Sequence, residues 1–275
     1  VHVYPVAITD VVAEMKRVIS ENGAEYRTTM DKICSYDPVG NIEDIQKSSA
    51  LKVAMKRFAD FYGCGAIAIQ CWSALQMDTG IMPCLSNALL TDEGIPVVCE
   101  TDLCGAVTAI MVKAAAGREA VPFFADITVR HPQNDNAELL WHCGNFPPSL
   151  AKDAALMSVG GNPYMSDKNY GVVNWELKSG DITVARFDGD HGDYRLLIGE
   201  VKTTDGPMNL GSYVWIETDN WKKWEHRLVE GPYIHHVAGA YGHFGEILSE
   251  ACKYLNGLCP DVVQPTEQHL VERWW

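Results

Sequence analysis

Two carboxylates in this sequence occupy positions from which an acidic side chain could do chemistry. Glu100 directly follows the apolar run 95–99, and ligand sites in open α/β sheets lie outside the carboxyl ends of such strands. The alternative role of Glu100, or of its neighbour Asp102, is to cap the helix that follows. Asp126 lies within the apolar run 123–129, where burial of a charge is costly, so it either faces water or belongs to a site.

Histidines gather near the end of the sequence, where His235, His236 and His243 fall within nine residues. Neutral imidazole is the commonest side-chain ligand of metals. Carboxylates together with one or two histidines suit a divalent ion of the Mn, Fe or Co type. Another histidine, His142, precedes Cys143 in a strand-like segment, so the two side chains point to opposite faces and make poor joint ligands. The alternative for His142 is a hydrogen-bonded side chain at a turn.

Several other classes of site are not indicated. The sequence has no Gly-x-Ser-x-Gly, no Walker A loop, no Gly-x-Gly-x-x-Gly after a strand and no His-Glu-x-x-His. The acidic segment 188–193 lacks the spacing and the terminal Glu of a calcium loop, which favours a hairpin turn. A formal net charge of −14 argues against nucleic acid as a partner. No apolar run reaches about 18 residues, so we expect no membrane span.

The elements that must position these residues differ between the two parts of the chain. In the first part, helix-like and strand-like segments alternate, which predicts an open parallel α/β sheet over residues 1–117. The expected helices cover 7–22, 43–62, 81–91 and 103–116, and the expected strands cover 66–71 and 95–100.

The second part, residues 118–275, carries short strand-like segments separated by Gly-Asp and Asp-Gly turns. Examples are 121–129, 180–187 and 194–201. This pattern predicts a mostly antiparallel, barrel-like β domain. The spacing of residues 240–256 returns to that of a helix, which Gly257 would end, so we expect a C-terminal helix.

The cysteines indicate the compartment. The sequence has nine, an odd number, with no Cys-x-x-Cys pair, and several lie in apolar runs. Reduced, buried thiols in the cytoplasm explain this usage better than a disulfide framework does. The chain opens on Val1 without an initiator Met, so we interpret it as a segment from inside a longer protein.

Taken together, the order and spacing of several motifs resemble the L-fucose isomerase and L-arabinose isomerase superfamily, from about residue 35 to the end. The residues that carry the likeness are Val-Cys-Glu-Thr-Asp-Leu-Cys-Gly-Ala at 98–106, Phe-Ala-Asp at 124–126, Trp-His-Cys-Gly at 141–144, His-His at 235–236 and Tyr-Gly-His at 241–243. Cys71-Trp72, the Cys84 segment and 91–95 also look like an uncharacterised fucose-isomerase-like branch.

The resemblance implies a set of site residues. In that superfamily a Glu after a strand, a later acid and a His near the end hold the metal, and these roles fall on Glu100, Asp126 and His236. By similarity to arabinose isomerases, His142 is a candidate fourth ligand. The implied cofactor is a divalent metal, Mn²⁺ above all, and Glu100 and Asp126 are the catalytic candidates. The candidates for contacts with substrate are Trp72, Trp141, Asn145, His235 and Tyr241.

The implied activity is that of an aldose–ketose isomerase, an intramolecular oxidoreductase. It would act on a small sugar such as L-fucose or arabinose, moving a proton between C1 and C2 through a cis-enediol. The alternatives are a non-catalytic sugar-binding relative, or a metal-dependent aldolase or hydrolase with the same ligands. Relatives carry a further N-terminal domain of roughly 150–200 residues, an ordinary domain size, and assemble as homo-oligomers. We therefore expect the complete protein to be a homo-oligomer.

Overall fold

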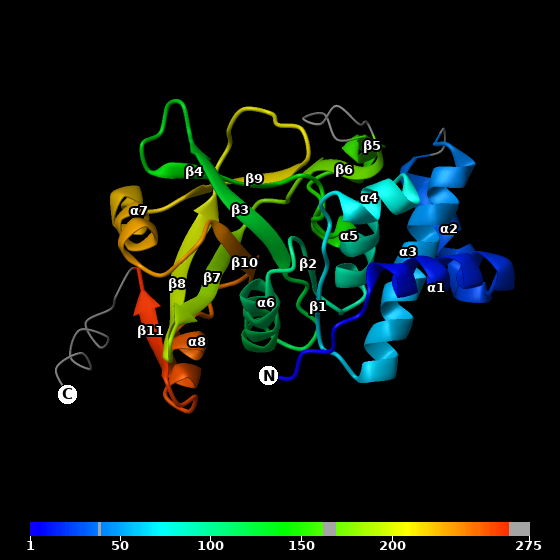
Figure 1. Ribbon diagram of the computed structural model, residues 1–275. Coiled ribbons are helices and arrows are strands. Elements are labelled where there is room, and N and C mark those ends of the chain that lie inside the picture. Colours follow the sequence, from blue (N-terminus) through cyan, green and yellow to red (C-terminus); the bar gives the residue numbers. More distant parts are fainter. Residues whose placement is uncertain (38–39, 162–168, 264–275) are drawn as a thin grey trace. The chain divides into compact units, whose positions relative to one another are not determined.

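The computed structural model describes residues 1–37, 40–161 and 169–263, and has a mixed α/β fold (Figure 1). Two compact units interleave along the chain. Unit 1 comprises Val1–Asp102, His142–Leu177 and Asn209–Ser212, and unit 2 comprises Leu103–Trp141, Lys178–Met208 and Tyr213–Trp275. Because the units interleave, the division into domains at residues 117 and 118 stays a prediction.

Unit 1 is rich in helices: α1 (Ile8–Glu21), α2 (Ala24–Tyr36), α3 (Ile42–Tyr62), α4 (Ala74–Thr79) and α5 (Cys84–Asp92). The Asn41 side chain caps the first turn of α3 by accepting a hydrogen bond from Glu43 N, and Gly63 ends that helix at φ 65°. The buried Lys52 in the middle of α3 is held by Glu25, 2.9 Å away, and by Glu93, 2.5 Å away. The helices predicted at 7–22 and 43–62 are confirmed as α1 and α3, and the helix predicted at 81–91 is found as α5, which begins three residues later. Helices α2 and α4 were not predicted.

The parallel sheet of unit 1 is small. Strand β1 (Ile67–Ala68) pairs in parallel with β2 (Val97–Val98), at the two places where the sequence predicted buried strands. The same unit holds the hairpin of β5 (Ser158–Gly161) and β6 (Tyr170–Glu176). The expected α/β character of the first part is thus confirmed, with strands shorter than the apolar runs suggested.

Unit 2 is built on a mostly antiparallel sheet whose strands follow the order β11–β8–β7–β10–β3–β4–β9. A further pairing of β8 with β9, through Lys202 with Glu217 and Thr203 with Ile216, brings the sheet close to a closed ring. This confirms the barrel-like second part. The strands are β3 (Phe123–Arg130), β4 (Ala137–His142), β7 (Asp181–Asp190), β8 (Asp193–Thr203), β9 (Ser212–Glu217), β10 (His236–Tyr241) and β11 (Leu258–Val262).

The tight turn between β7 and β8 is the hairpin expected at 188–193. Asp190 pairs with Asp193, and the two residues between them, His191 and Gly192, have φ values of 51° and 91°. Two consecutive residues with positive φ are typical of the turns that fit the twist of a hairpin. The prediction of a turn rather than a calcium loop is confirmed.

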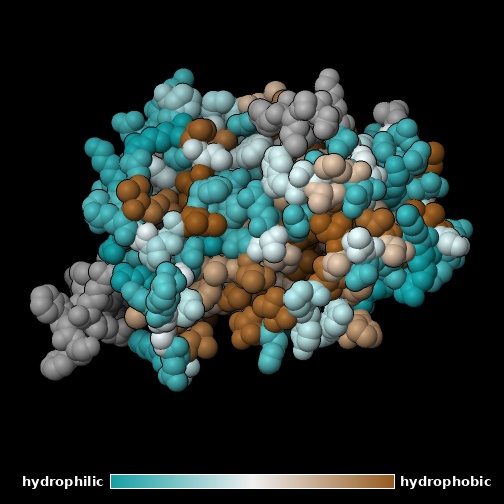
Figure 2. Space-filling model, in the orientation of Figure 1, coloured by the Kyte–Doolittle hydropathy of each residue, from teal (hydrophilic) through white to brown (hydrophobic). Residues whose placement is uncertain are grey.

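Among its described residues, unit 2 has the helices α6 (Leu103–Ala116), α7 (Trp221–Glu230) and α8 (Gly245–Cys252). Helix α6, which was predicted at 103–116, packs against β7 and β10. Its outer side keeps Leu103 and Ile110 nearly half exposed, and hydrophobic residues gather around this helix on the face shown in Figure 2. None of the described helices is both long and apolar enough to cross a membrane.

The helix predicted at 240–256 is only partly correct. Residues up to Tyr241 belong to β10, and the helix α8 begins at Gly245. The reason lies in the packing of Gly239, because a Cβ at this position would lie 2.5 Å from the ring of Phe123 on the neighbouring strand. The glycine leaves room for the Phe123 ring, so that β10 can pair with both β3 and β7. The helix-like spacing of the apolar residues does not reveal this strand pairing.

Glu138 in β4 leads to a prediction about stability and pH. Its side chain is 3% exposed, and burial raises its pKa from 4.5 to about 7, with Glu225 adding to the shift and Arg130 opposing it. Above the folded-state pKa the carboxylate is charged in both states, so the folded protein bears the cost of a buried charge. Below the unfolded-state pKa both states are protonated and this cost is absent.

We therefore expect Glu138→Gln to raise the free energy of unfolding at about pH 8 by up to about 3 kcal/mol. At about pH 4.5 the neutral carboxylic acid and the amide are nearly equivalent, so the same substitution should have little effect. Urea unfolding of both proteins at the two pH values measures the difference. An equal effect at both pH values would show that charge burial is not the cause.

Candidate metal centre

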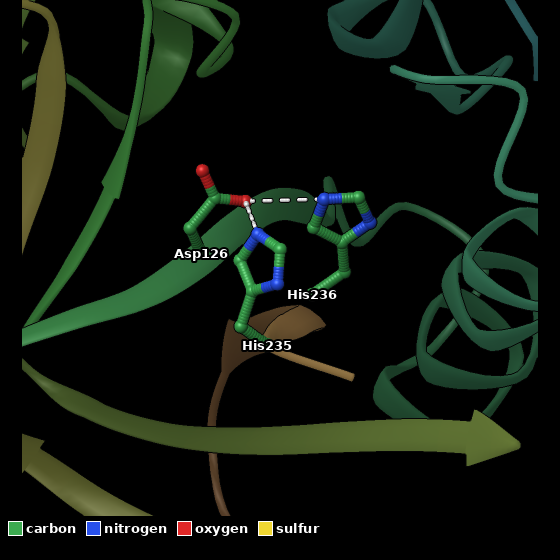
Figure 3. Close-up of side chains that lie close together, drawn as sticks. All are labelled: Asp126, His235 and His236. Carbon is green, nitrogen blue, oxygen red and sulfur yellow. Dashed lines mark ion pairs between the residues drawn. The ribbon is translucent and has the colours of Figure 1, made fainter. Parts of the chain in front are cut away.

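Three side chains of unit 2 converge on one point, as Figure 3 shows: Asp126, His235 and His236. The Oδ1 atom of Asp126 lies 3.5 Å from Nε2 of His236 and 3.9 Å from Nε2 of His235. One ligand atom from each residue lies within 4.8 Å of those of the other two. The structure thus brings together two of the predicted metal ligands, Asp126 and His236, with a residue predicted to contact substrate.

The register of the sheet explains why Asp126 and His236 meet. His236 is the first residue of β10 and is paired with Asp126 of β3, so their side chains project from the same face. On the other side of β3, Asp126 is paired with Trp141 of β4. His236, Asp126 and Trp141 therefore form a row across three strands. Trp141, a candidate for contact with sugar, lies beside the candidate metal centre.

His235 approaches the same carboxylate by a different route. Neighbouring residues within a strand point to opposite faces of the sheet. His235 precedes β10, although its carbonyl oxygen still accepts a hydrogen bond from Ile127 N at 2.9 Å. Because His235 lies outside the strand, its side chain need not point to the face opposite that of His236. The two imidazole centroids are 4.5 Å apart, and the rings are tilted by 60° to each other.

Burial divides the three residues into an inner pair and an outer histidine. The side chains of His236 and Asp126 are 3% and 14% exposed, whereas that of His235 is 58% exposed. The ring of Phe124 packs edge-on against His236 at a centroid distance of 5.0 Å, which restricts the imidazole. His236 is thus held rigidly beside Asp126, and His235 covers the pair from the solvent side.

This donor set fits a divalent metal. Bonds of about 2.0–2.3 Å from one ion to carboxylate oxygen and imidazole nitrogen place neighbouring ligand atoms about 3–4 Å apart. The distances from Asp126 Oδ1 to the two imidazole nitrogens, 3.5 Å and 3.9 Å, fall in this range. Oxygen and imidazole donors together suit Mn, Fe, Co or Zn, whereas an all-oxygen site would suit Mg or Ca. The residues could therefore hold a metal without rearrangement of the sheet.

Glu100 lies in unit 1, in a backbone conformation that few residues adopt. It follows β2, and both Glu100 and Thr101 have positive φ values, 61° and 57°. The left-handed region costs a residue with a Cβ about 1–2 kcal/mol, and such strain is concentrated at functional sites. Trp72 Nε1 donates a hydrogen bond to Glu100 Oε1 at 3.1 Å. The turn therefore presents an exposed carboxylate beside an exposed indole, two residues that the sequence proposed separately for the site.

A network of buried thiols supports this turn. Glu100 N donates to Cys71 Sγ at 3.4 Å, and a hydrogen bond with Cys99 lowers the pKa of the Cys71 thiol. Asn145, which was proposed to contact substrate, is buried and donates from Nδ2 to Cys99 Sγ at 3.6 Å. Sequence reasoning treated these cysteines as ordinary core residues. The available signal was that Cys71 and Cys99 directly precede Trp72 and Glu100.

His142 and Tyr241 are the remaining predicted site residues. His142 is buried in unit 1, where its Nδ1 lies 3.2 Å from Cys143 Sγ, and that sulfur lies 3.5 Å from Cys84 Sγ. Tyr241 ends β10, so about five strand steps, or roughly 16 Å, separate it from His236. Its hydroxyl donates to the carbonyl oxygen of Lys178. The roles of His142 as a ligand and of Tyr241 in sugar binding stay predictions.

Comparison with known proteins gives one family and several relatives. Residues 140–259 match the family described as L-fucose isomerase, C-terminal domain, which confirms the resemblance that the motifs predicted. The sulfoquinovose isomerase of Priestia aryabhattai is 28% identical over 220 residues, which are 78% of this chain and 48% of that protein. The sulfoquinovose isomerase of Alkalicoccus urumqiensis is 30% identical over 168 residues, which are 60% of this chain and 37% of that protein.

Two facts about these matches bear on the site. The family match includes His142, His235 and His236, whereas Glu100 and Asp126 lie before its first residue. The chain spans about half the length of the Priestia relative, at 48%.

Proposed function

We propose that this chain, whose residues 140–259 match the C-terminal domain of L-fucose isomerases, is part of a metal-dependent aldose–ketose isomerase. The observation that carries the proposal is the convergence of Asp126, His235 and His236 on one point of the β ring. A metal centre in a chain that is similar to sugar isomerases accounts for both findings. The same centre in an aldolase or hydrolase would leave the likeness to isomerases unexplained.

Asp126, His236 and Glu100 are the proposed ligands, with His235 or His142 as a further donor. We propose Mn²⁺ as the metal, since mixed carboxylate and imidazole donors suit it. When bound, a divalent ion would act as a Lewis acid that stabilises the negative charge developing on the sugar's O1 and O2. Coordination would lower the basicity of either carboxylate, so the base must be a carboxylate oxygen that does not contact the ion.

Glu100 is the proposed base. Its carboxylate is exposed, and the indole N–H of Trp72 fixes the orientation of Oε1. In the reaction Glu100 takes the proton from C2 of an aldose and returns it to C1 of the resulting cis-enediol, while the hydroxyl proton passes from O2 to O1, which gives the ketose. The ring faces of Trp72 and Trp141 would pack on the sugar, since aromatic rings combine an apolar surface with defined geometry.

Two classes of sugar compete as substrate. The family match favours an uncharged sugar such as L-fucose or arabinose, and the names of the relatives favour the sulfonated sugar sulfoquinovose. We also propose a homo-oligomeric assembly and a cytoplasmic location. The superfamily resemblance supports the first, and the nine cysteines, which form no disulfide in the part of the chain that the structure describes, support the second.

The test is an assay of the full-length protein, stripped of metal and then supplied with Mn²⁺, against L-fucose, L-arabinose and sulfoquinovose. We expect one of these aldoses to be converted to its ketose only when metal is present. Metal-dependent sugar binding without conversion would instead support a non-catalytic relative. Cleavage of a carbon–carbon bond or of a glycosidic bond would support the aldolase or hydrolase alternative.

A further inference from the structure

A cavity of about 690 Å³ in unit 2 has more cationic than anionic side chains in its wall. Four Lys and Arg residues contribute to its wall, together with His226, against two carboxylates, Glu230 and Asp261. The chain as a whole has a formal net charge of −14, so this concentration of positive charge runs against its average. The four are Arg195, Lys222, Lys223 and Arg227.

The position of two lysines in α7 is unfavourable for the helix itself. Lys222 and Lys223 occupy the first turn of this ten-residue helix, which contains no acidic residue there. The amino end of a helix carries partial positive charge and is stabilised by anions, so cations placed there are repelled. Two of the first backbone N–H groups of α7 are already bound, that of Trp221 to Asn136 and that of Lys223 to Asn220, so side chains would hold the anion. An anion in the cavity would offset the repulsion between the lysines and the helix.

Arg227 is fixed in the wall before any ligand arrives. Its Nη1 lies 2.9 Å from Oδ1 of the buried Asp261, whose other oxygen accepts a hydrogen bond from the Tyr233 hydroxyl at 3.0 Å. A guanidinium held in this way loses little side-chain freedom on binding and presents its remaining N–H groups in a planar fork. Arg195 carries a second guanidinium, 3.5 Å from Asp193 and about half exposed. Such forks match the oxygens of phosphate.

We propose that this cavity binds a phosphate group, either as free phosphate or as part of a small phosphorylated metabolite. The volume of the cavity exceeds what one phosphate ion fills, which leaves room for the rest of a metabolite. The cavity shares no lining residue with the candidate metal centre.

The experiment is a calorimetric titration of the full-length protein, at low ionic strength, with inorganic phosphate and in parallel with glucose 6-phosphate. We expect saturable binding of one molecule per chain. Arg195→Gln and Lys223→Gln should each lower the affinity for phosphate about tenfold, which is the effect expected from the loss of one charge-assisted hydrogen bond. Tighter binding of glucose 6-phosphate would identify a metabolite as the occupant, and equal binding would identify free phosphate.

Two control variants keep the result specific. Lys202→Gln makes the same change of charge outside the cavity and should leave the affinity within about twofold, since exposed charges at a distance are screened. His236→Ala should bind phosphate as well as the wild type does. Absence of saturable binding, equal loss in Lys202→Gln, or loss in His236→Ala would overturn the proposal. Thermal unfolding without phosphate should show Lys223→Gln to be at least as stable as the wild type, because a cation has left the amino end of α7.

Discussion

His236→Ala is expected to lower the affinity for Mn²⁺ by about 100-fold or more. Loss of residues that merely orient a ligand already costs about 10–100-fold, and His236 is a proposed ligand itself. Its imidazole is 3% exposed and lies 3.5 Å from Asp126 Oδ1, so its removal leaves the inner part of the centre with a single donor. Calorimetric titration of the metal-free protein with Mn²⁺ gives the affinity.

His235→Ala is the matched control for this prediction, because it removes the same side chain from the adjacent position. The His235 ring is 58% exposed and its Nε2 is farther from Asp126 Oδ1, at 3.9 Å. We expect this variant to keep most of the affinity, within about tenfold of the wild type. If the two variants lose affinity equally, His235 is a full ligand and the distinction between the inner pair and the outer histidine is wrong.

Glu100→Gln is expected to lower kcat by about 100-fold to 10,000-fold, the usual contribution of a general base. The amide keeps an oxygen that can ligate a metal and accept the hydrogen bond from Trp72, but it cannot take up the proton from the sugar. The affinity for Mn²⁺ should therefore change much less than in His236→Ala. The measurement is steady-state turnover of the full-length protein on its sugar, with the metal titration in parallel.

The control for this substitution is Glu176→Gln, a change of the same kind in unit 1. Glu176 is paired with Lys152 at 2.9 Å and takes no part in the proposed site, so turnover should be unchanged. Should Glu100→Gln turn over at the wild-type rate, the proton acceptor must be sought elsewhere, first at Asp126.

The sequence predicted the long helices well because burial of one helix face imposes a regular spacing on the apolar residues. The bounds of α1, α3 and α6 agree with the predicted ranges to within one residue. Helix α7 was missed although its signal was present: Asn220 accepts a hydrogen bond from Lys223 N, and Trp221 and Trp224 lie on one buried face. The many polar residues of α7 made this apolar face hard to recognise in the sequence.

Long-range pairing could not be predicted from local patterns. His236 lies opposite Asp126 across a separation of 110 residues, and nothing near either residue encodes this register. The superfamily resemblance supplied the association of Asp126 with His236, and the structure confirms that the two meet. The approach of His235 was not anticipated, because the sequence does not show that β10 begins only at His236. The thiol contacts beneath Glu100 depend on packing between separate segments and were missed for the same reason.

The central claim is that Asp126, His236 and Glu100 hold one divalent ion. Diffraction data from crystals grown with Mn²⁺, recorded at the manganese absorption edge, locate that ion directly. We expect one anomalous peak per chain, about 2.0–2.3 Å from a carboxylate oxygen of Asp126 and from Nε2 of His236, with a Glu100 oxygen in the same coordination sphere. A peak that contacts neither Asp126 nor His236, or a Glu100 carboxylate more than about 10 Å from that of Asp126, would contradict the central claim.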